Sequence, residues 1–227
     1  IRHAMRAPFM VLRRQIRIFL QRYIYRFLNE QDEFYLYPLH VSSESSTVVF
    51  ARHFSDQLNS IKQIAFTLPF PSKLYVKEHP NAVGTRSMEF YKDLMRIPNV
   101  VLISPYENMY RLIEKTSGVV VLTSTVGMEA AFVGKPVYVL GNVFYSYHPM
   151  CRKVQGFAEL HKRIQQDLGH AQEVSAPDLE QINARFFASY ARNTIPGNLL
   201  LASLGNDVND YKEIYESIGA IIREKKI

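Results

Sequence analysis

Between residues 34 and 141, short apolar segments alternate with segments of helical periodicity, and this alternation limits the possible folds most. The apolar segments lack the regular alternation of apolar and polar residues that a half-exposed strand shows. They therefore predict strands buried on both faces, as in a parallel sheet covered by helices on each side. The expected strands are residues 34–41, 73–77, 99–104, 118–124 and 135–141. The expected helices are residues 55–68, 86–97, 107–117 and 126–134.

This order of elements predicts an α/β fold: a Rossmann-like, doubly wound parallel sheet with flanking N- and C-terminal helices. The crossovers should be right-handed, and Ser55 is the expected N-cap of the first helix. We divide the chain into a basic amphipathic helical arm (1–29), a Rossmann-like domain (30–150) and a helical C-terminal extension packed on that domain (151–227).

The charge of the chain is concentrated in the arm. Residues 1–29 hold seven arginines and no acidic residue, so they contribute +7 to a net charge of +6, and the remainder carries −1. A basic amphipathic helix of this kind can lie on an anionic membrane surface. It can equally be an ordinary helix that packs on a neighbouring domain with its arginines in water. Because the remainder is nearly neutral and contains no recognition module, we do not expect nucleic-acid binding.

The composition is that of a soluble globular protein, with 47% hydrophobic and 21% charged residues. No stretch approaches the ~18 unbroken apolar residues of a membrane span. The single cysteine, Cys151, excludes an intrachain disulfide and fits a reducing compartment such as the cytoplasm. Arg152 and Lys153 beside it leave open a thiol with a lowered pKa. Without a histidine partner, an unreactive cysteine is the favoured interpretation.

Several common motifs are missing from the sequence. It contains neither GxxxxGK[ST] nor GxGxxG, which excludes a P-loop and the usual dinucleotide fingerprint. It also contains no Asp-x-Asp pair and no His/Cys cluster with metal-ligand spacing, so we expect no metal.

The segment "VLTSTVGMEAAFVG" (121–134) joins a buried strand to a short helix. Ser124 and Thr125 stand where the helix begins, and their hydroxyls together with unpaired backbone N–H groups suit a phosphate. Gly127 would let a ligand approach the backbone, and Glu129 would accept hydrogen bonds from a ribose or sugar hydroxyl. The alternative is that Ser124 or Thr125 only caps the helix and that Glu129 is an ordinary acid in its first turn.

The segment "KLYVKEHP" (73–80) ends a predicted strand with three groups that carry charge or exchange protons. Lys77 would supply positive charge, and His79 would donate to a phosphate oxygen or protonate a leaving group. Glu78 would orient the imidazole or face solvent. The alternative is a solvated strand end without function.

Two further polar loops follow strands of the same predicted sheet. "PLHVSSESST" (38–47) contains His40 and Glu44, and "SPYENMY" (104–110) contains Ser104 and Tyr106 as groups that would cover a base or ribose. Because parallel strands end at one edge of a sheet, all these loops should meet there, and that edge is where α/β proteins bind ligands. The second loop is also explained as a turn and helix cap.

Together, "YPLHVSSESST", "LYVKEHP", "SPYENMYRLI" and "TSTVGMEAAFVGKPVYVLG" resemble the bacterial capsule polysaccharide biosynthesis proteins over residues 34–150. Those proteins are glycosyltransferases with two Rossmann-like halves, the GT-B fold. The "HP" and "S/T-x-G-x-E-A" features also occur in sialyl- and Kdo-transferases that use CMP-sugars. The resemblance implies phosphate-binding roles for His79, Ser124 and Thr125 and a ribose or base role for Glu129.

One loop departs from the family pattern. The family often has Gln-Pro before the glutamate of this loop, whereas residues 42–46 here are Ser-Ser-Glu-Ser-Ser. This departure puts in doubt any donor preference that depends on those two residues. Glu44 remains the candidate acid near the reacting sugar, so Glu44 and His79 are the expected catalytic residues.

The resemblance implies the C-terminal, donor-binding half of a glycosyltransferase, within a longer natural protein. It would transfer a sugar from a nucleotide-activated donor, CMP-Kdo being the example, to a capsule or other surface polysaccharide or a glycolipid. It would need no metal and would work in the cytoplasm, at the inner face of the inner membrane where the arm provides peripheral contact. The alternatives are a CDP-glycerol-type polyol-phosphate transferase and a noncatalytic nucleotide-sugar-binding scaffold subunit.

Overall fold

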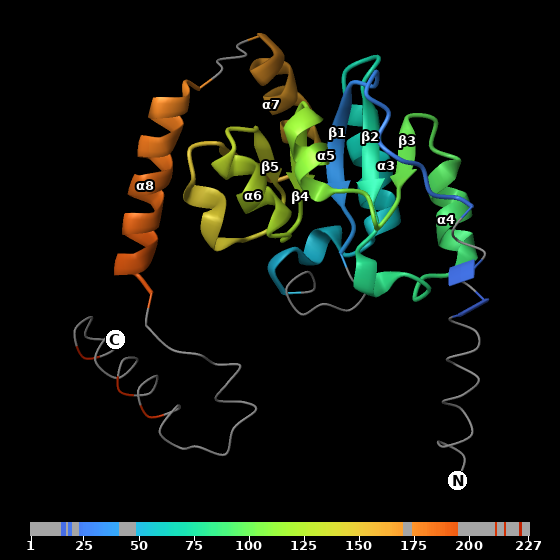
Figure 1. Ribbon diagram of the computed structural model, residues 1–227, viewed down its shortest axis with the longest axis horizontal. Coiled ribbons are helices and arrows are strands. Elements are labelled where there is room, and N and C mark those ends of the chain that lie inside the picture. Colours follow the sequence, from blue (N-terminus) through green and yellow to red (C-terminus); the bar gives the residue numbers. More distant parts are fainter. Residues whose placement is uncertain are drawn as a thin grey trace. The chain divides into compact units, whose positions relative to one another are not determined.

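The structure is a computed structural model that describes residues 15, 16, 18, 19, 23–40, 49–169, 174–194, 212, 216 and 223. The chain divides into two compact units, residues 1–179 and 180–227, and each is considered by itself. In the first unit, the described residues form one six-stranded sheet in which every neighbouring pair is parallel (Figure 1). The strands are β1 (Phe34–Pro38), β2 (Lys73–Lys77), β3 (Val100–Ile103), β4 (Gly118–Val121), β5 (Val137–Val139) and β6 (Cys151–Lys153).

The strand order is β3-β2-β1-β4-β5-β6. The chain therefore builds the sheet outward from β1 through β2 to β3, returns to the other side of β1 with β4, and continues to β6. This order confirms the predicted Rossmann-like, doubly wound sheet. It also places the point where the winding reverses between β1 and β4.

Helices connect the first five strands as the periodicity predicts: α3 (Gln57–Thr67), α4 (Met88–Met95), α5 (Met109–Lys115) and α6 (Val126–Phe132). Two helices follow β6, α7 (Phe157–Gly169) and α8 (Ala176–Arg192), and the loops contain the 3-10 turns η1 (Arg52–Phe54), η2 (Pro80–Ala82) and η3 (Phe144–Tyr147). Asp56 rather than the expected Ser55 caps α3, because the Asp56 carboxylate accepts the Asn59 backbone N–H at 3.1 Å.

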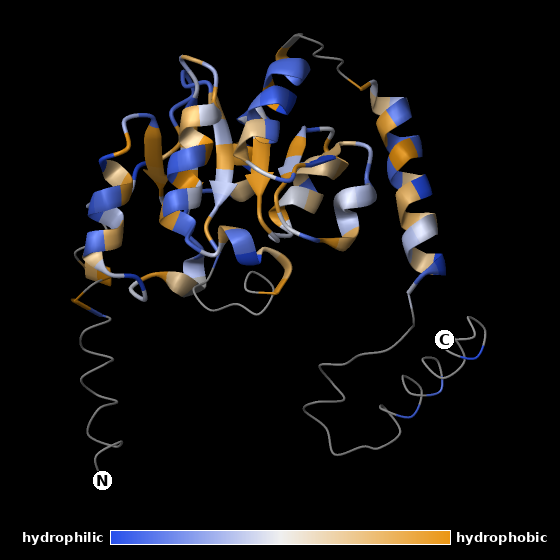
Figure 2. Ribbon diagram, turned by 180° about the vertical axis from the view of Figure 1, so that it is seen from behind, coloured by the Kyte–Doolittle hydropathy of each residue, from blue (hydrophilic) through white to orange (hydrophobic). Residues whose placement is uncertain are grey.

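The core lies on both faces of the sheet, and hydrophobic residues are concentrated in the strands (Figure 2). All five residues of β1 are buried. Side chains of α3, α4 and α7 join one continuous apolar cluster with alternate strand residues. Leu112 and Ile113 of α5 and the buried alanines of α6 lie outside that cluster. Burial of both faces explains why the strands are apolar throughout rather than alternating.

The sheet is wider than the sequence predicts, because an additional segment pairs at each of its two edges. A sixth strand, β6, pairs with β5, although the predicted series of strands ends at residue 141. At the other edge, Arg26 forms an isolated parallel bridge with Ile103, so the end of the predicted arm lies against β3. Among the described residues, no helix has both the length and the apolar character needed to cross a membrane. Most of the arm, and most of the predicted C-terminal extension beyond residue 194, lie outside the described residues.

Candidate functional site

The loops that follow β1, β2, β3 and β4 all leave the carboxyl edge of the sheet, where the candidate residues were expected. β1 lies between β2 and β4, so the His79 loop and the Ser124 loop flank the exit of β1. In open α/β sheets ligands bind outside the carboxyl ends of the strands at this reversal of winding. Glu44 lies outside the described residues, so its place relative to this edge stays a prediction.

The β4–α6 turn presents hydroxyls at this edge. The Ser124 Oγ accepts the Val126 N–H at 3.3 Å, a weak local bond that leaves the hydroxyl's own proton unassigned. Thr125 is the N-cap residue of α6 and is exposed, but its side chain makes no capping hydrogen bond. Helix capping alone therefore does not account for Thr125. Glu129 lies one turn further along and is half-buried, and this burial raises the pKa of its carboxyl group.

Gly127 has a packing role that the sequence does not suggest. A Cβ at this position would lie 2.8 Å from the Tyr145 Oη and 3.0 Å from a Val121 methyl group. The Tyr145 hydroxyl donates to the Ser124 carbonyl oxygen. The missing side chain therefore makes room for Tyr145 of the protein itself, and the approach of a ligand to the Gly127 backbone stays a prediction. Tyr145 ties the β5 loop to the β4–α6 turn, which the sequence did not reveal.

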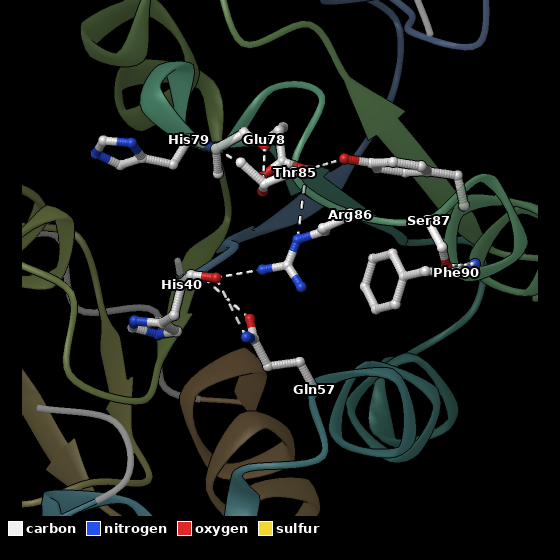
Figure 3. A network of polar contacts seen from close by, with 10 residues as sticks. His40, Gln57, Glu78, His79, Thr85, Arg86, Ser87 and Phe90 are labelled. Carbon is white, nitrogen blue, oxygen red and sulfur yellow. Dashed lines mark hydrogen bonds and ion pairs between the residues drawn. The ribbon is translucent and has the colours of Figure 1, made fainter. Parts of the chain in front are cut away.

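At the end of β2, Glu78 and His79 point in different directions (Figure 3). Glu78 is 1% exposed and accepts hydrogen bonds from the Tyr91 hydroxyl and from the His79 backbone N–H. It thus neither faces solvent nor orients the imidazole, as the sequence had suggested; it holds the main chain of the histidine. His79 is exposed, and its ring points away from the Glu78 carboxylate.

Lys77 is buried beneath this edge. Its Nζ donates to the Pro105 carbonyl oxygen at 2.8 Å and so joins the end of β2 to the loop after β3. Burial lowers the pKa of the Lys77 ammonium group, and nearby Glu107 and Glu78 oppose that shift. Lys77 therefore contributes positive charge from inside the domain rather than as an exposed group.

The loop after β3 divides into one structural and one exposed residue. Ser104 is buried, its N–H donates to the Arg26 carbonyl oxygen, and its Oγ accepts the Tyr106 N–H at 3.2 Å. These bonds stabilise the turn, as the alternative interpretation expected. Tyr106 is 79% exposed and available to a ligand at this edge.

A buried polar cluster that the sequence did not reveal joins the loops after β1 and β2 (Figure 3). The Arg86 Nη2 donates to the His40 carbonyl oxygen, and its Nε lies 3.5 Å from the Glu78 Oε2, an ion pair too long for a hydrogen bond. Gln57 donates to the same carbonyl at 3.2 Å and accepts the His40 N–H at 3.0 Å. One sequence signal could have identified Arg86: it precedes the N-cap of a helix, where the helix dipole disfavours a cation.

His40 itself is uncharged at neutral pH. Burial, followed by the nearby Arg86 charge, lowers the pKa of its imidazole to about 4. Its Nε2 and the Tyr37 hydroxyl are buried, and neither makes a hydrogen bond within the described part of the chain. At this edge His40 is therefore a neutral polar group.

Two other features of the described residues, Cys151 and a cavity, do not contribute to this edge. Burial raises the pKa of the Cys151 thiol to about 12, so the alternative of an activated cysteine is wrong. Among the described residues, no three His, Cys, Asp or Glu side chains gather as a metal site would require. A cavity of about 480 Å³ lies at the opposite, amino edge of the sheet, and there Asp167 already accepts the Tyr138 hydroxyl at 2.8 Å and pairs with Arg152.

Comparison with solved structures finds distant similarity. A KpsC β-Kdo 2,7-transferase from Thermosulfurimonas dismutans has 23% identity over 63% of this chain and 44% of its own, with a TM-score of 0.44. The UDP-GlcNAc 2-epimerase of Neisseria meningitidis bound to UDP-GlcNAc has 16% identity over 73% of this chain and 46% of its own, with a TM-score of 0.43. The chain thus spans less than half the length of either protein.

No curated protein matches the sequence. The family model described as "Capsule polysaccharide biosynthesis protein" matches residues 15–187, which is most of the chain and includes every candidate residue of the carboxyl edge. The chain belongs to the capsule polysaccharide biosynthesis protein family.

Proposed function

We propose that this chain binds a nucleotide-activated sugar at the carboxyl edge of its sheet and is the donor-binding half of a glycosyltransferase for capsule or other surface polysaccharide. One observation carries the proposal: β2 and β4 flank β1, so the exposed His79 and the Ser124–Thr125 turn stand on either side of the point where the winding reverses. Family membership supplies the polysaccharide context.

The proposed chemistry is stabilisation of a leaving nucleotide. As the bond between sugar and phosphate breaks, negative charge grows on the phosphate oxygens, and donors fixed around them lower the barrier. The His79 imidazole, the hydroxyls of Ser124 and Thr125 and the backbone N–H groups of their turn would supply these donors. The buried Lys77 ammonium adds positive charge from beneath. No step in this proposal needs a metal.

Other groups would bind the rest of the donor. The half-buried Glu129 would accept from ribose hydroxyls, and the exposed Tyr106 would cover the base. Glu44 would act as the acid near the reacting sugar. The donor we propose is CMP-linked, the acceptor a polysaccharide or glycolipid, and the place of reaction the cytoplasmic face of the inner membrane.

Calorimetric titration of the chain with CMP, UDP and GDP tests the proposal. We expect CMP to bind, and His79→Ala and Ser124→Ala to weaken that binding. His161→Ala, on the exposed surface of α7, and Ser117→Ala, at the amino edge, are matched controls that should leave it unchanged. Absence of binding by any nucleotide would contradict the proposal.

The other outcomes separate the alternatives. Preference for UDP or GDP would keep the transferase and discard the CMP-linked donor. A further titration with CDP-glycerol that shows tighter binding than with CMP would favour a polyol-phosphate transferase. Nucleotide binding without sugar transfer, in the longest natural form of the protein, would favour a noncatalytic subunit.

A further inference from the structure

A buried polar cluster connects the loop after β1 with the loop after β2, which contains His79 of the proposed phosphate site. Its members are His40, Gln57, Glu78, Arg86 and Tyr91. All five side chains lie inside the domain, and each residue is no more than 8% exposed. They come from four places in the chain: the exit of β1, the start of α3, the loop after β2, and α4. A polar cluster of this size in the interior requires an explanation, because burying charges is costly unless they are well paired.

Stability alone explains the ion pair poorly. Replacing a buried ion pair by apolar side chains of similar volume is often neutral or stabilising. An apolar cluster would therefore hold α4 against β2 equally well. What an apolar cluster would not provide is a set of directed bonds to the main chain.

The two charged groups make such bonds on different loops. The Glu78 Oε1 accepts the His79 N–H at 3.1 Å, and the Arg86 guanidinium donates to the His40 carbonyl oxygen. Between them, the Glu78–Arg86 ion pair spans 3.5 Å. The main chain at His79 and the main chain at His40 are thus linked through two side chains.

Each end of this link is fixed from a second direction. The Tyr91 hydroxyl donates to the other Glu78 carboxylate oxygen, Oε2. Gln57 bonds both the N–H and the carbonyl oxygen of His40. The Arg86 guanidinium also lies over the Phe90 ring, with its central carbon 4.8 Å from the ring centroid. A guanidinium has donors in a fixed fork, which suits simultaneous contact with a carboxylate and a carbonyl better than an ammonium does.

The loop between Glu78 and Arg86 folds back through consecutive turns. The Ala82 N–H donates to the His79 carbonyl oxygen at 2.9 Å, and the Thr85 N–H donates to the Ala82 carbonyl oxygen at 3.0 Å. Gly84 has a φ of 79°, a left-handed conformation that favours glycine. These consecutive turns bring Arg86 back to the exit of β1, next to the start of the loop that contains Glu44.

We infer that Arg86 and Glu78 are positioning residues for the donor site: they set the spacing between His79 and the exit of β1. Neither touches the ligand; both act through the main chain of His79 and His40. The inference rests on the proposed function for its ligand, but its structural content, the fixing of the His79 main chain, is testable without one.

The test compares Arg86→Lys and Tyr91→Phe with Tyr138→Phe. The two tyrosine changes are matched, because each removes a hydroxyl that donates to a buried or half-buried carboxylate, on Glu78 at the carboxyl edge or on Asp167 at the amino edge. CMP affinity is measured by calorimetry, and protection of the His79 amide by NMR hydrogen exchange. We expect both network variants to lose His79 amide protection and Arg86→Lys to lose about tenfold or more in affinity, while Tyr138→Phe loses neither.

Three results would overturn the positioning role of Arg86 and Glu78. Unchanged His79 amide protection in Arg86→Lys and Tyr91→Phe overturns the inference. Weakened affinity in Arg86→Lys with unchanged protection also overturns it, because Arg86 would then contact the ligand directly. Equal losses in Tyr138→Phe would show general destabilisation and overturn it as well.

If the wild-type chain binds no nucleotide, the proposed function fails, and the exchange measurement alone decides on positioning. If Arg86→Lys does not fold, Tyr91→Phe and Glu78→Gln give the same readout.

Discussion

Single residues at the carboxyl edge make close packing contacts that their sequence context does not suggest. Gly127 is an example, since its missing side chain accommodates Tyr145 and Val121. Gly127→Ala should destabilise the fold by about 1–3 kcal/mol, because the added methyl group forces neighbouring atoms apart. Denaturant unfolding measures this change. Gly156→Ala is the matched control, because a Cβ there meets no atom within 4 Å, and a loss as large as that of Gly127→Ala would refute the packing argument.

His40 makes stability depend on pH in a defined direction. Its pKa is about 4 in the folded chain and 6.5 in its ordinary state, so unfolding takes up a proton between these values. The free energy of unfolding should therefore fall as the pH falls from 6.5 to 4, by up to about 3 kcal/mol from this residue. Denaturant titrations of wild type and His40→Gln across this window measure it. The variant should show a shallower slope, and parallel slopes would contradict the burial of a neutral imidazole.

Cys151 should be slow to react. Because burial raises its thiol pKa to about 12, almost none of it is thiolate at neutral pH. Iodoacetamide should modify the folded protein far more slowly than the protein in urea, as followed by mass spectrometry. Equal rates in the two conditions would show that the thiol is not protected by the fold.

The residues of the candidate site could be predicted only in part. Ser124, Thr125 and His79 follow apolar strands directly, so their sequence context places them at the carboxyl edge. Arg86 and Gln57 follow no such pattern, because both contact His40 from distant positions in the chain. Arg86 is 46 residues from His40, and Gln57 is 17 residues from it. Contacts of this kind depend on how loops pack, which local periodicity does not encode.

At the scale of elements, the sheet could be predicted where burial is complete. β1 and β4 are buried throughout, and that burial produces the continuous apolar runs by which they were identified. β6 has three residues, Cys151–Lys153, that are half-buried or exposed, so its sequence shows no apolar run. Its pairing with β5 comes from the fold as a whole. A short strand whose residues are half-buried or exposed lacks the apolar run that revealed β3 at the other edge of the sheet.

Arg26 extends the sheet beyond β3 by a single isolated bridge. The Arg26 N–H donates to the Leu102 carbonyl oxygen and the Ser104 N–H to the Arg26 carbonyl oxygen, each at 2.8 Å, and the Leu28 N–H donates to Glu107. The amides of Arg26 and Ser104 should therefore be protected from hydrogen exchange. Glu107→Ala should lower the protection at Leu28. Rapid exchange at Arg26 in the wild type would show that this part of the predicted arm does not pair with the sheet.

At the scale of the whole molecule, the uneven charge is the feature that the fold leaves unexplained. The seven arginines of residues 1–29 lie mostly outside the described residues, so the membrane contact of the arm stays a prediction. The chain should sediment with anionic vesicles at low salt and be released at high salt, because exposed charges are screened. Changing the seven arginines to glutamine should abolish sedimentation, and unchanged sedimentation would refute the role of the arm.

The central claim is that a nucleotide phosphate is held where β2 and β4 flank the exit of β1. A crystal structure of the chain grown with CMP tests this most directly. We expect the phosphate within hydrogen-bonding distance of the His79 imidazole and of the Ser124–Thr125 turn, with the Glu78–Arg86 pair intact beneath it. CMP bound elsewhere, such as in the amino-edge cavity beside Asp167 and Arg152, would show that the carboxyl edge is not the nucleotide site.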